Sequence, residues 1–194
     1  MKLIGIDDAG RGPVLGPMIL AGVLIEENEE KILKELGAKD SKLLTPQRRR
    51  VLGDKISKNY KHHIEVTEPA EIDESENLNY LEAIKTARII NKLNENLSEK
   101  IRVIVDCPST NINAWTLDVK KLIKKTDNIE LTCLHKADSL HPIVSAASIL
   151  AKEKREELVY KLKLKHNVDF GSGYPSDPKT KEFIKENYNN PQYK

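Results

Sequence analysis

Residues Leu3-Ile4-Gly5-Ile6-Asp7-Asp8 form a short apolar run that stops at two adjacent acids. The apolar part predicts a buried β-strand, and the acids place two carboxylates where that strand ends. A second apolar run, from Met18 to Ile25, predicts a neighbouring strand, because Gly16-Pro17 marks its start. The chain is therefore expected to open with two strands, and its first candidate functional side chains are Asp7 and Asp8.

Strands and helices alternate through the rest of the chain. Apolar side chains recur at near-helical spacing from Leu78 to Leu97 and predict one long amphipathic helix. Further strands are expected over residues 63–67, 101–105 and 129–134, and further helices over residues 28–36, 46–59, 113–125, 144–165 and 180–188. Two strands followed by this alternation predict an α/β fold, with a mixed central β-sheet flanked by α-helices.

The composition narrows the classes of function. The 32 lysines and arginines nearly balance the 30 acids, so nucleic-acid binding would have to rest on local basic patches and not on bulk charge. Cys107 and Cys133 are far apart and each lies in an apolar stretch, which predicts two buried free thiols. We find no apolar run long enough to cross a bilayer and no signal peptide after Met1, and therefore expect a cytoplasmic protein without membrane contact.

Four acids stand at or just beyond the ends of predicted strands. Asp7 and Asp8 end the first strand, Asp106 ends the strand at 101–105, and Asp138 follows the last one. Ligands of open α/β sheets collect at the carboxyl ends of strands. Clustered carboxylates need a cation, and Mg²⁺ or Mn²⁺ suits oxygen ligands. Two such ions, roughly 3.5–4 Å apart, support phosphodiester hydrolysis. Each acid alone is also compatible with a turn or a solvated loop.

Three loops carry further candidate contacts to a nucleic acid. Gly10-Arg11-Gly12 lets the backbone pass close to a ligand, although a tight turn explains the same pattern. Lys42 and Lys136 offer ammonium groups to phosphates, and a solvated loop is the alternative interpretation of both. Tyr174 presents a ring that can pack on a sugar or base, or can anchor its own loop.

Taken in order, these stretches resemble the motifs of the ribonuclease HII (type 2 ribonuclease H) family, in the compact form of its archaeal branch. The resemblance covers nearly the whole chain and is carried by residues 5–13 (GIDDAGRGP), 39–42 (KDSK), 105–106 (VD), 135–138 (HKAD), 142–152 (PIVSAASILAK) and 171–178 (GSGYPSDP). It implies a ribonuclease H-like fold in one catalytic domain spanning residues 1–194, with a C-terminal helical part over about 140–194.

The resemblance also implies an activity. The protein would hydrolyse the RNA strand of RNA–DNA hybrids and cut at single ribonucleotides embedded in duplex DNA, leaving 5′-phosphate and 3′-hydroxyl ends. The implied ligands of two catalytic Mg²⁺ or Mn²⁺ ions are Asp7, Asp8, Asp106 and Asp138. The backbone of Gly10, Arg11 and Gly12 would contact the ribose 2′-hydroxyl. Tyr174 would pack on the neighbouring deoxyribose, and Lys42 and Lys136 would contact phosphates. We expect the protein to act as a monomer.

Two features depart from the family pattern. The second acid is usually a glutamate, so Asp8 shortens its reach by one methylene. The sequence ends at Lys194, where relatives usually continue through a further helical segment that helps to hold substrate, and substrate affinity is the property we expect this to affect most. Two alternatives stay open: another ribonuclease H-like phosphoryl-transfer enzyme, such as a resolvase or transposase core, and a non-catalytic nucleic-acid binding module.

Overall fold

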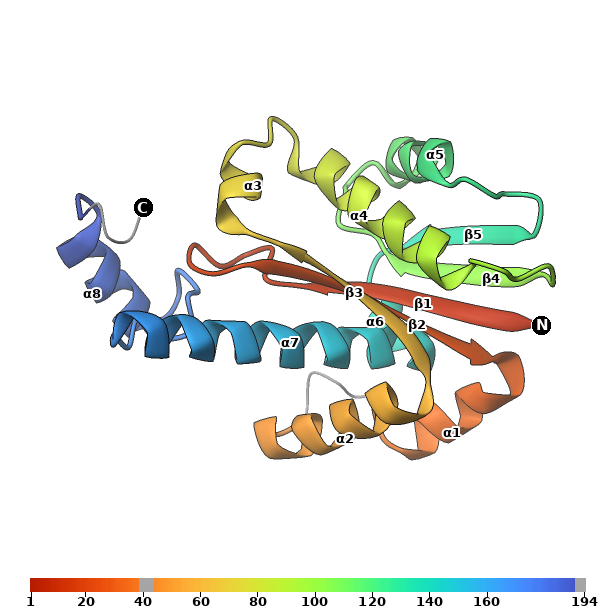
Figure 1. Cartoon of the computed structure of the whole chain (residues 1–194), viewed down its shortest axis with the longest axis horizontal. Helices are drawn as coiled ribbons and strands as arrows, with labels where there is room; N and C mark the ends of the chain where they lie inside the picture. Colours follow the sequence, from red (N-terminus) through yellow and green to blue (C-terminus); the bar gives the residue numbers. More distant parts are fainter. Residues whose placement is uncertain (39–43, 191–194) are drawn as a thin grey trace.

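The computed structural model describes residues 1–38 and 44–190. Its strands form one sheet in the order β3-β2-β1-β4-β5 (Figure 1). They are β1 (Lys2–Ala9), β2 (Met18–Glu26), β3 (Lys61–Thr67), β4 (Ile101–Asp106) and β5 (Ile129–Leu134). The pairs β1–β2 and β2–β3 are antiparallel, whereas β1–β4 and β4–β5 are parallel. The mixed sheet expected from the sequence is therefore confirmed.

The helices differ from the expected ones at a few places. They are η1 (Glu27–Glu29), α1 (Glu30–Glu35), α2 (Pro46–Asn59), α3 (Pro69–Asp73), α4 (Leu78–Leu93), α5 (Ile112–Leu122), α6 (Ala137–Leu140), α7 (Pro142–His166) and α8 (Pro178–Asn187). The expected helix at 28–36 is divided between η1 and α1. Helix α4 ends before Leu97 because Asn96 has a left-handed φ of 67°. The short helices α3 and α6 were not expected. None of the described helices could span a membrane.

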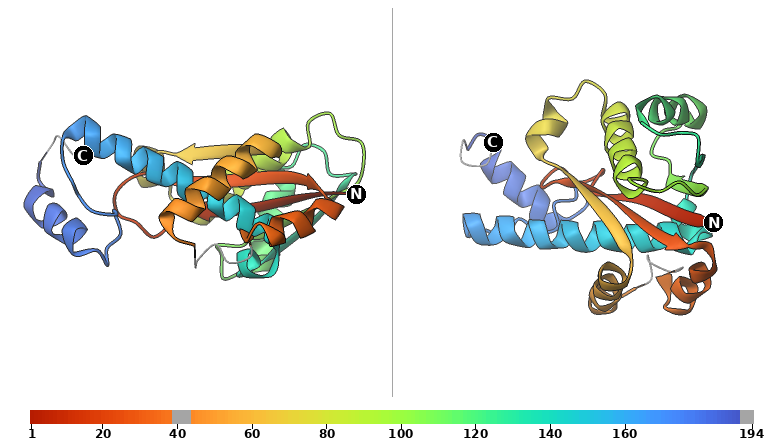
Figure 2. Two further views of the ribbon diagram at one scale, coloured as in Figure 1. Left: turned by 90° about the horizontal axis from the view of Figure 1, so that it is seen from below. Right: turned by 45° about the vertical axis from the view of Figure 1, so that its right-hand side comes forward.

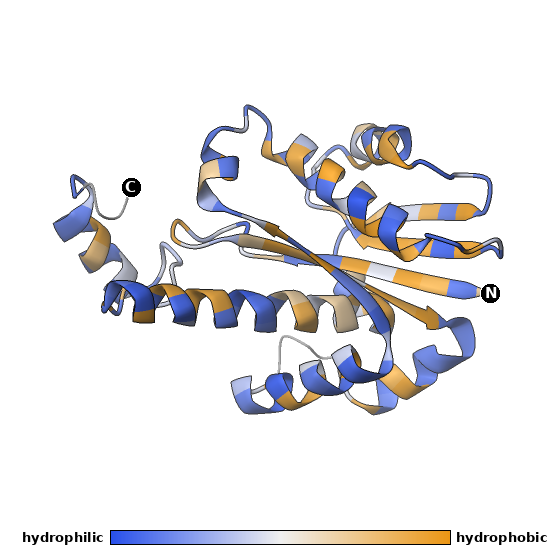
Figure 3. Cartoon of the chain, in the orientation of Figure 1, coloured by the Kyte–Doolittle hydropathy of each residue, from blue (hydrophilic) through white to orange (hydrophobic). Residues whose placement is uncertain are grey.

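Helices cover both faces of the sheet. Helix α7 lies along one face with α1 and α2 packed against it, and α4 and α5 cover the other (Figures 1 and 2). Side chains of β1 alternate between the two layers, since Leu3 packs on the α7 side and Ile4 and Ile6 on the α4 side. Hydrophobic residues accordingly dominate β1, β2 and β4 (Figure 3).

Two glycines allow the helices to approach the sheet closely. A Cβ atom at Gly5 would lie 2.5 Å from the carbonyl carbon and oxygen of Ile143, at the start of α7. On β2, a Cβ atom at Gly22 would lie 2.3 Å from Cγ2 of Ile89 on α4. Because α7 touches β1 from Gly5 onwards, its next turns pass directly beside the carboxyl end of that strand.

Both cysteines are free thiols, as expected. Cys107 is buried. Cys133 is only partly buried, contrary to expectation, because it lies on β5 at the edge of the sheet.

Candidate metal and substrate site

Four aspartates gather at the carboxyl ends of β1 and β4. Asp7 and Asp8 stand near the end of β1, Asp106 ends β4, and Asp138 lies in α6, which follows β5. Oδ1 of Asp106 accepts a hydrogen bond from the backbone N–H of Ala137 at 3.0 Å, so it holds the start of α6 beside β4. Asp7 and Asp138 are buried, whereas Asp8 and Asp106 are half-buried. These four acids were expected from the sequence to lie at one edge of the sheet, and the structure has them there.

The electrostatics of the aspartates show that they share one environment. Burial raises the pKa of Asp7 well above its usual range, and the negative charges of Asp8 and Asp106 raise it further. Burial also raises the pKa of Asp8 to about 6, although the positive charge of Arg11 opposes this. Asp106 and Asp138 add to the repulsion felt by Asp8. A bound cation would relieve this repulsion.

Glu82 on α4 is an acid of the site that sequence reasoning missed. Its side chain is only 1% exposed, and it lines a small buried cavity together with Asp7, Asp8 and Asp106. Burial raises the pKa of Glu82 to about 8, although the charge of Arg11 lowers it and that of Asp8 raises it. The sequence pattern could have identified Glu82, because it interrupts the apolar face of a helix, and acids are rarely buried there unless they are paired.

The side chain of Arg11 is turned towards the protein. One Nη atom donates a hydrogen bond to the backbone oxygen of Pro108 at 2.8 Å, and the other donates to Oδ1 of Asn79 at 2.6 Å. Nε of Arg11 also lies 3.2 Å from Oε1 of Glu82. The guanidinium thus fastens the Gly10–Gly12 loop to α4 and to the loop after β4.

The Gly10–Gly12 loop and the Tyr174 loop form one surface. The backbone N–H groups of Val14 and Leu15 donate to the oxygen of Gly173, at 2.8 and 3.3 Å. A Cβ atom at Gly12 would lie 3.8 Å from Cε1 of Tyr174, so the ring stands in contact distance of that loop. Tyr174 is exposed, with 39% of its surface open to solvent. Its ring is therefore accessible to a ligand.

Side chains just before and within α8 hold the Tyr174 loop in shape. Asp177 accepts hydrogen bonds from the backbone N–H groups of Ser172 (2.7 Å) and Lys179 (3.0 Å). Oγ1 of Thr180 accepts from the N–H of Gly173 at 3.0 Å and donates to the oxygen of Phe170 at 2.8 Å. Each hydrogen bond restricts the loop, so the position of the ring is defined before any ligand arrives.

The candidate lysines are placed unequally. Lys42 lies outside the described residues. Lys136 is exposed between β5 and α6, where its left-handed φ of 58° turns the chain towards Asp138. Lys152 on α7 was not expected at the site, yet its positive charge lowers the pKa of Asp8. Lys152 ends the motif at 142–152, but the charged residues that follow it gave no reason to single it out.

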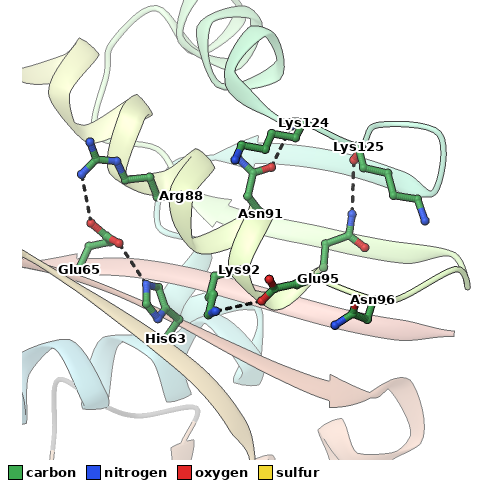
Figure 4. A pocket seen from close by; sticks show the side chains of 10 residues that line it. His63, Glu65, Arg88, Asn91, Lys92, Glu95, Asn96, Lys124 and Lys125 are labelled. Atoms are coloured by element: carbon green, nitrogen blue, oxygen red, sulfur yellow. Dashed lines mark hydrogen bonds and ion pairs between the residues drawn. The ribbon is translucent and has the colours of Figure 1, made fainter.

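A larger cavity, of about 480 Å³, lies away from the aspartates between β3, the end of α4 and the segment before β5 (Figure 4). Its polar side chains already bond to one another: His63 and Arg88 contact Glu65, and Lys92 pairs with Glu95 (Figure 4). Because these side chains already bond to one another, the cavity offers few free polar groups that point towards a common ligand.

The donor set of the aspartates fits a hard divalent cation. Among the described residues, no three His, Cys, Asp or Glu side chains are already arranged as the ligands of a metal ion. The four aspartates nevertheless offer only carboxylate oxygens, which Mg²⁺ and Mn²⁺ prefer. The pKa values of Asp7 and Asp8 are raised by burial and by neighbouring aspartates, so a cation is the expected counter-charge.

Comparison with known proteins gives one consistent result. The family model described as Ribonuclease HII matches residues 4–193. Ribonuclease HII of Methanosarcina barkeri is 41% identical over 95% of this chain and 84% of its own length, and that of Pyrococcus furiosus is 42% identical over 97% and 82%. The structure of ribonuclease H2 from Pyrococcus horikoshii is similar at a TM-score of 0.85, with 39% identity, and covers 97% of this chain and 87% of that one.

Two further solved structures are similar. One is the complex of PCNA with ribonuclease HII from Archaeoglobus fulgidus, with 35% identity, a TM-score of 0.85, and coverage of 96% of this chain and 88% of that one. Bst-RNase HIII in complex with Mn²⁺ shares the fold at a TM-score of 0.76, with 22% identity and coverage of 96% and 63%.

Proposed function

Because the chain belongs to the ribonuclease HII family, and is thus an endoribonuclease that acts on RNA–DNA hybrids, we propose that its four gathered aspartates hold the divalent cations of that reaction. One observation carries the proposal: at the end of the central strands, burial and the charges of Asp8 and Asp106 raise the pKa of Asp7, and burial and the charges of Asp106 and Asp138 raise the pKa of Asp8. Such a cluster suits a pair of Mg²⁺ or Mn²⁺ ions.

The proposed chemistry is phosphodiester hydrolysis. When bound, the cations lower the pKa of an attacking water and stabilise the charge on the leaving oxygen. The water oxygen bonds to phosphorus, the bond from phosphorus to the 3′ oxygen breaks, and that oxygen takes up a proton. The products are a 3′-hydroxyl and a 5′-phosphate. The part of this chain is to hold the carboxylates in place, and the hydrogen bond from Ala137 to Asp106 supports this role.

We assign recognition of the ribose to the joined loops. The backbone from Gly10 to Gly12 contacts the 2′-hydroxyl, and Tyr174 packs on the neighbouring deoxyribose. Gly10 has a φ of +99°, which side chains rarely tolerate, and Arg11 is fastened away from the ligand side. Since one 2′-hydroxyl suffices for this contact, the enzyme should cut at a lone ribonucleotide in duplex DNA. Lys136 and Lys42 are the proposed phosphate contacts.

Metal dependence tests the assignment of the aspartates. Activity on an RNA–DNA hybrid should vanish with excess chelator and return with Mg²⁺ or Mn²⁺. Asp7→Asn or Asp106→Asn should lower kcat by roughly two or more powers of ten and weaken Mn²⁺ binding measured by calorimetry. Asp54→Asn is the matched control, because Asp54 is an exposed acid on α2. Full activity of the Asp106→Asn enzyme would rule out this site.

Recognition by the ring is tested with a pair of tyrosine variants. Tyr174→Ala should weaken cutting at a single ribonucleotide by about tenfold more than cutting of a long hybrid, since a stacked ring contributes about 1–3 kcal/mol. Tyr188→Ala is the control, because Tyr188 is exposed at the end of α8. Equal losses on the two substrates would contradict the role of Tyr174.

A further inference from the structure

We propose that Arg155 on α7 is a positioning residue for ribose recognition: its buried guanidinium joins the Gly10–Gly12 loop to the Tyr174 loop and sets the distance between them. The inference rests on the proposed function of these two loops and adds a residue that the catalytic chemistry does not use. It is carried by the contacts of Arg155, by the glycines around it and by its burial.

Arg155 bonds both loops at once. One Nη atom donates to the backbone oxygen of Leu15 at 3.0 Å, and both Nη atoms lie 3.4 Å from the backbone oxygen of Ser172. Leu15 follows the Gly10–Gly12 loop, and Ser172 precedes Tyr174 by two residues. The guanidinium carbon also lies 5.1 Å from the centre of the Tyr174 ring, within the range of a cation–π contact. A single side chain therefore touches the supports of both recognition elements.

Glycines of both loops make room for this side chain. A Cβ atom at Gly10 would lie 2.7 Å from Nε of Arg155, and one at Gly173 would lie 3.1 Å from an Nη atom. Gly10 and Gly173 have φ values of +99° and +83°, so their backbones are also shaped as glycine alone readily allows. The loops are thus fitted around the guanidinium from two sides, and neither can shift without breaking a contact to Arg155.

The burial of Arg155 is unfavourable for stability alone. The residue is 6% exposed, and burial lowers the pKa of its guanidinium, although the nearby charge of Glu156 raises it. Its Nε has no hydrogen-bond partner among the described residues and lies against Gly10. A buried charge that is only partly compensated lowers stability, and an apolar side chain of similar volume often replaces such a group without loss. We therefore attribute Arg155 to recognition, where its charge lies directly behind the proposed sugar- and phosphate-facing surface.

The test compares two substrates and four enzymes. The substrates are duplex DNA with one ribonucleotide and a long RNA–DNA hybrid, and the enzymes are the parent, Arg155→Met, Arg155→Lys and Lys154→Met. Arg155→Met should lower kcat/KM on the single ribonucleotide by about tenfold more than on the hybrid. Arg155→Lys keeps the charge but cannot bond both carbonyls with a rigid fork, so its loss should be intermediate. Lys154→Met removes a neighbouring, half-buried charge of α7 and should not change the ratio of kcat/KM on the two substrates.

A double variant asks whether Arg155 acts through the ring. If it does, the double variant Arg155→Met/Tyr174→Ala should discriminate between the substrates no worse than Tyr174→Ala alone. The effects of substituting two residues that act together are not additive. Additive losses would overturn the proposal. Failure of Tyr174→Ala itself to change discrimination would instead refute the proposed function of the loop, so the two failures are distinguishable.

Hydrogen exchange separates positioning from folding. In Arg155→Met, amides of residues 10–17 and 170–176 should exchange faster, while the sheet exchanges as in the parent and Tm stays within a few degrees. Unchanged exchange in both loops would contradict the proposed link. If Arg155→Met does not fold, Arg155→Lys carries the same test, and parent-like discrimination and loop exchange in that variant would overturn the role of the two-carbonyl contact.

Discussion

Asp8 is the residue that most affects the geometry of the proposed metal site. It lies just before the end of β1, where the family usually has a glutamate, so its oxygens are withdrawn by about 1.5 Å, the length of one carbon–carbon bond. Catalytic geometry tolerates displacements of only about 0.5 Å. Glu82 stands across the same small cavity, but Arg11 holds its position. If Asp8 serves the cations as proposed, this would require a shift of the backbone, a bridging water, which Mg²⁺ readily retains, or a more tolerant metal such as Mn²⁺.

Substitution of Asp8 tests this reasoning. Asp8→Asn should lose most activity because it removes a charge that holds the cations. Asp8→Glu should stay within about tenfold of the parent, or roughly 1.4 kcal/mol in the barrier, and should shift the preference between Mg²⁺ and Mn²⁺. The measurement is kcat on a hybrid substrate at saturating metal. If Asp8→Asn cuts as fast as the parent with both metals, the site consists of the other three aspartates alone.

Glu82 should make the stability of the metal-free protein depend on pH. Its pKa is about 8 in the folded protein and near 4.5 in the unfolded chain, chiefly because it is buried. Between these values the folded state binds the extra proton, so the contribution of Glu82 is complete below about pH 4.5 and is lost as the pH rises towards 8. Glu82→Gln removes this dependence.

Urea unfolding of Glu82→Gln at several pH values provides the measurement. Relative to the parent, the variant should gain on the order of 2 kcal/mol in free energy of unfolding between pH 5 and pH 9. Glu156→Gln is the control, since Glu156 is an exposed acid on α7. Parallel pH profiles of parent and Glu82→Gln would show that Glu82 is not held in its neutral form.

Among the elements, the contact between β1 and α7 positions most of the site. Strand β1 supplies Asp7 and Asp8, and α7 supplies Lys152, whose charge acts on Asp8, and Arg155, which bonds the backbone of Leu15 and Ser172. The contact requires a glycine at position 5, because a Cβ atom there would meet backbone atoms of Ile143 at 2.5 Å. Backbone atoms of a helix packed on a sheet cannot yield as a flexible side chain can.

Gly5→Ala should therefore lower the free energy of unfolding by about 1–3 kcal/mol or more, the usual effect of overpacking. Chemical denaturation measures it. Gly12→Ala is the matched control, since its methyl would meet only Cε1 of Tyr174 at 3.8 Å. Gly12→Ala should unfold close to the parent and yet lose discrimination for the ribonucleotide, whereas equal stability of the two variants would contradict this description of the β1–α7 contact.

Elements were predictable where one local pattern determines them. The apolar runs that end in acids located β1 and β4, and with them Asp7, Asp8 and Asp106, because a strand's end is visible in the sequence. The long-range hydrogen bonds that hold the loops in place were not predictable in this way. Arg155 bonds Leu15 across 140 positions, and Arg11 bonds Pro108 across 97. Helical periodicity says which face is buried, but not that a charge on that face will meet a carbonyl of a distant loop.

At the scale of the molecule, the proposed catalytic site and the proposed recognition site occupy two parts of one edge. The carboxyl ends of β1 and β4 and helix α6 carry the aspartates, while the loops around Gly12 and Tyr174 carry the proposed ribose contacts, and α7 passes beneath both (Figure 1). The near balance of acids and bases over the 194 residues is consistent with this arrangement, because the substrate would be held by local contacts and not by overall charge.

The most direct test is cleavage of a DNA duplex that contains one ribonucleotide, with Mg²⁺, with Mn²⁺ and with excess chelator, beside an all-DNA duplex of the same sequence. We predict one metal-dependent cut on the 5′ side of the ribonucleotide, leaving a 3′-hydroxyl and a 5′-phosphate, and no cut in the all-DNA duplex. Cutting in excess chelator, or cutting of both duplexes alike, would contradict the assignment of the aspartates to the cations and of the loops to the 2′-hydroxyl.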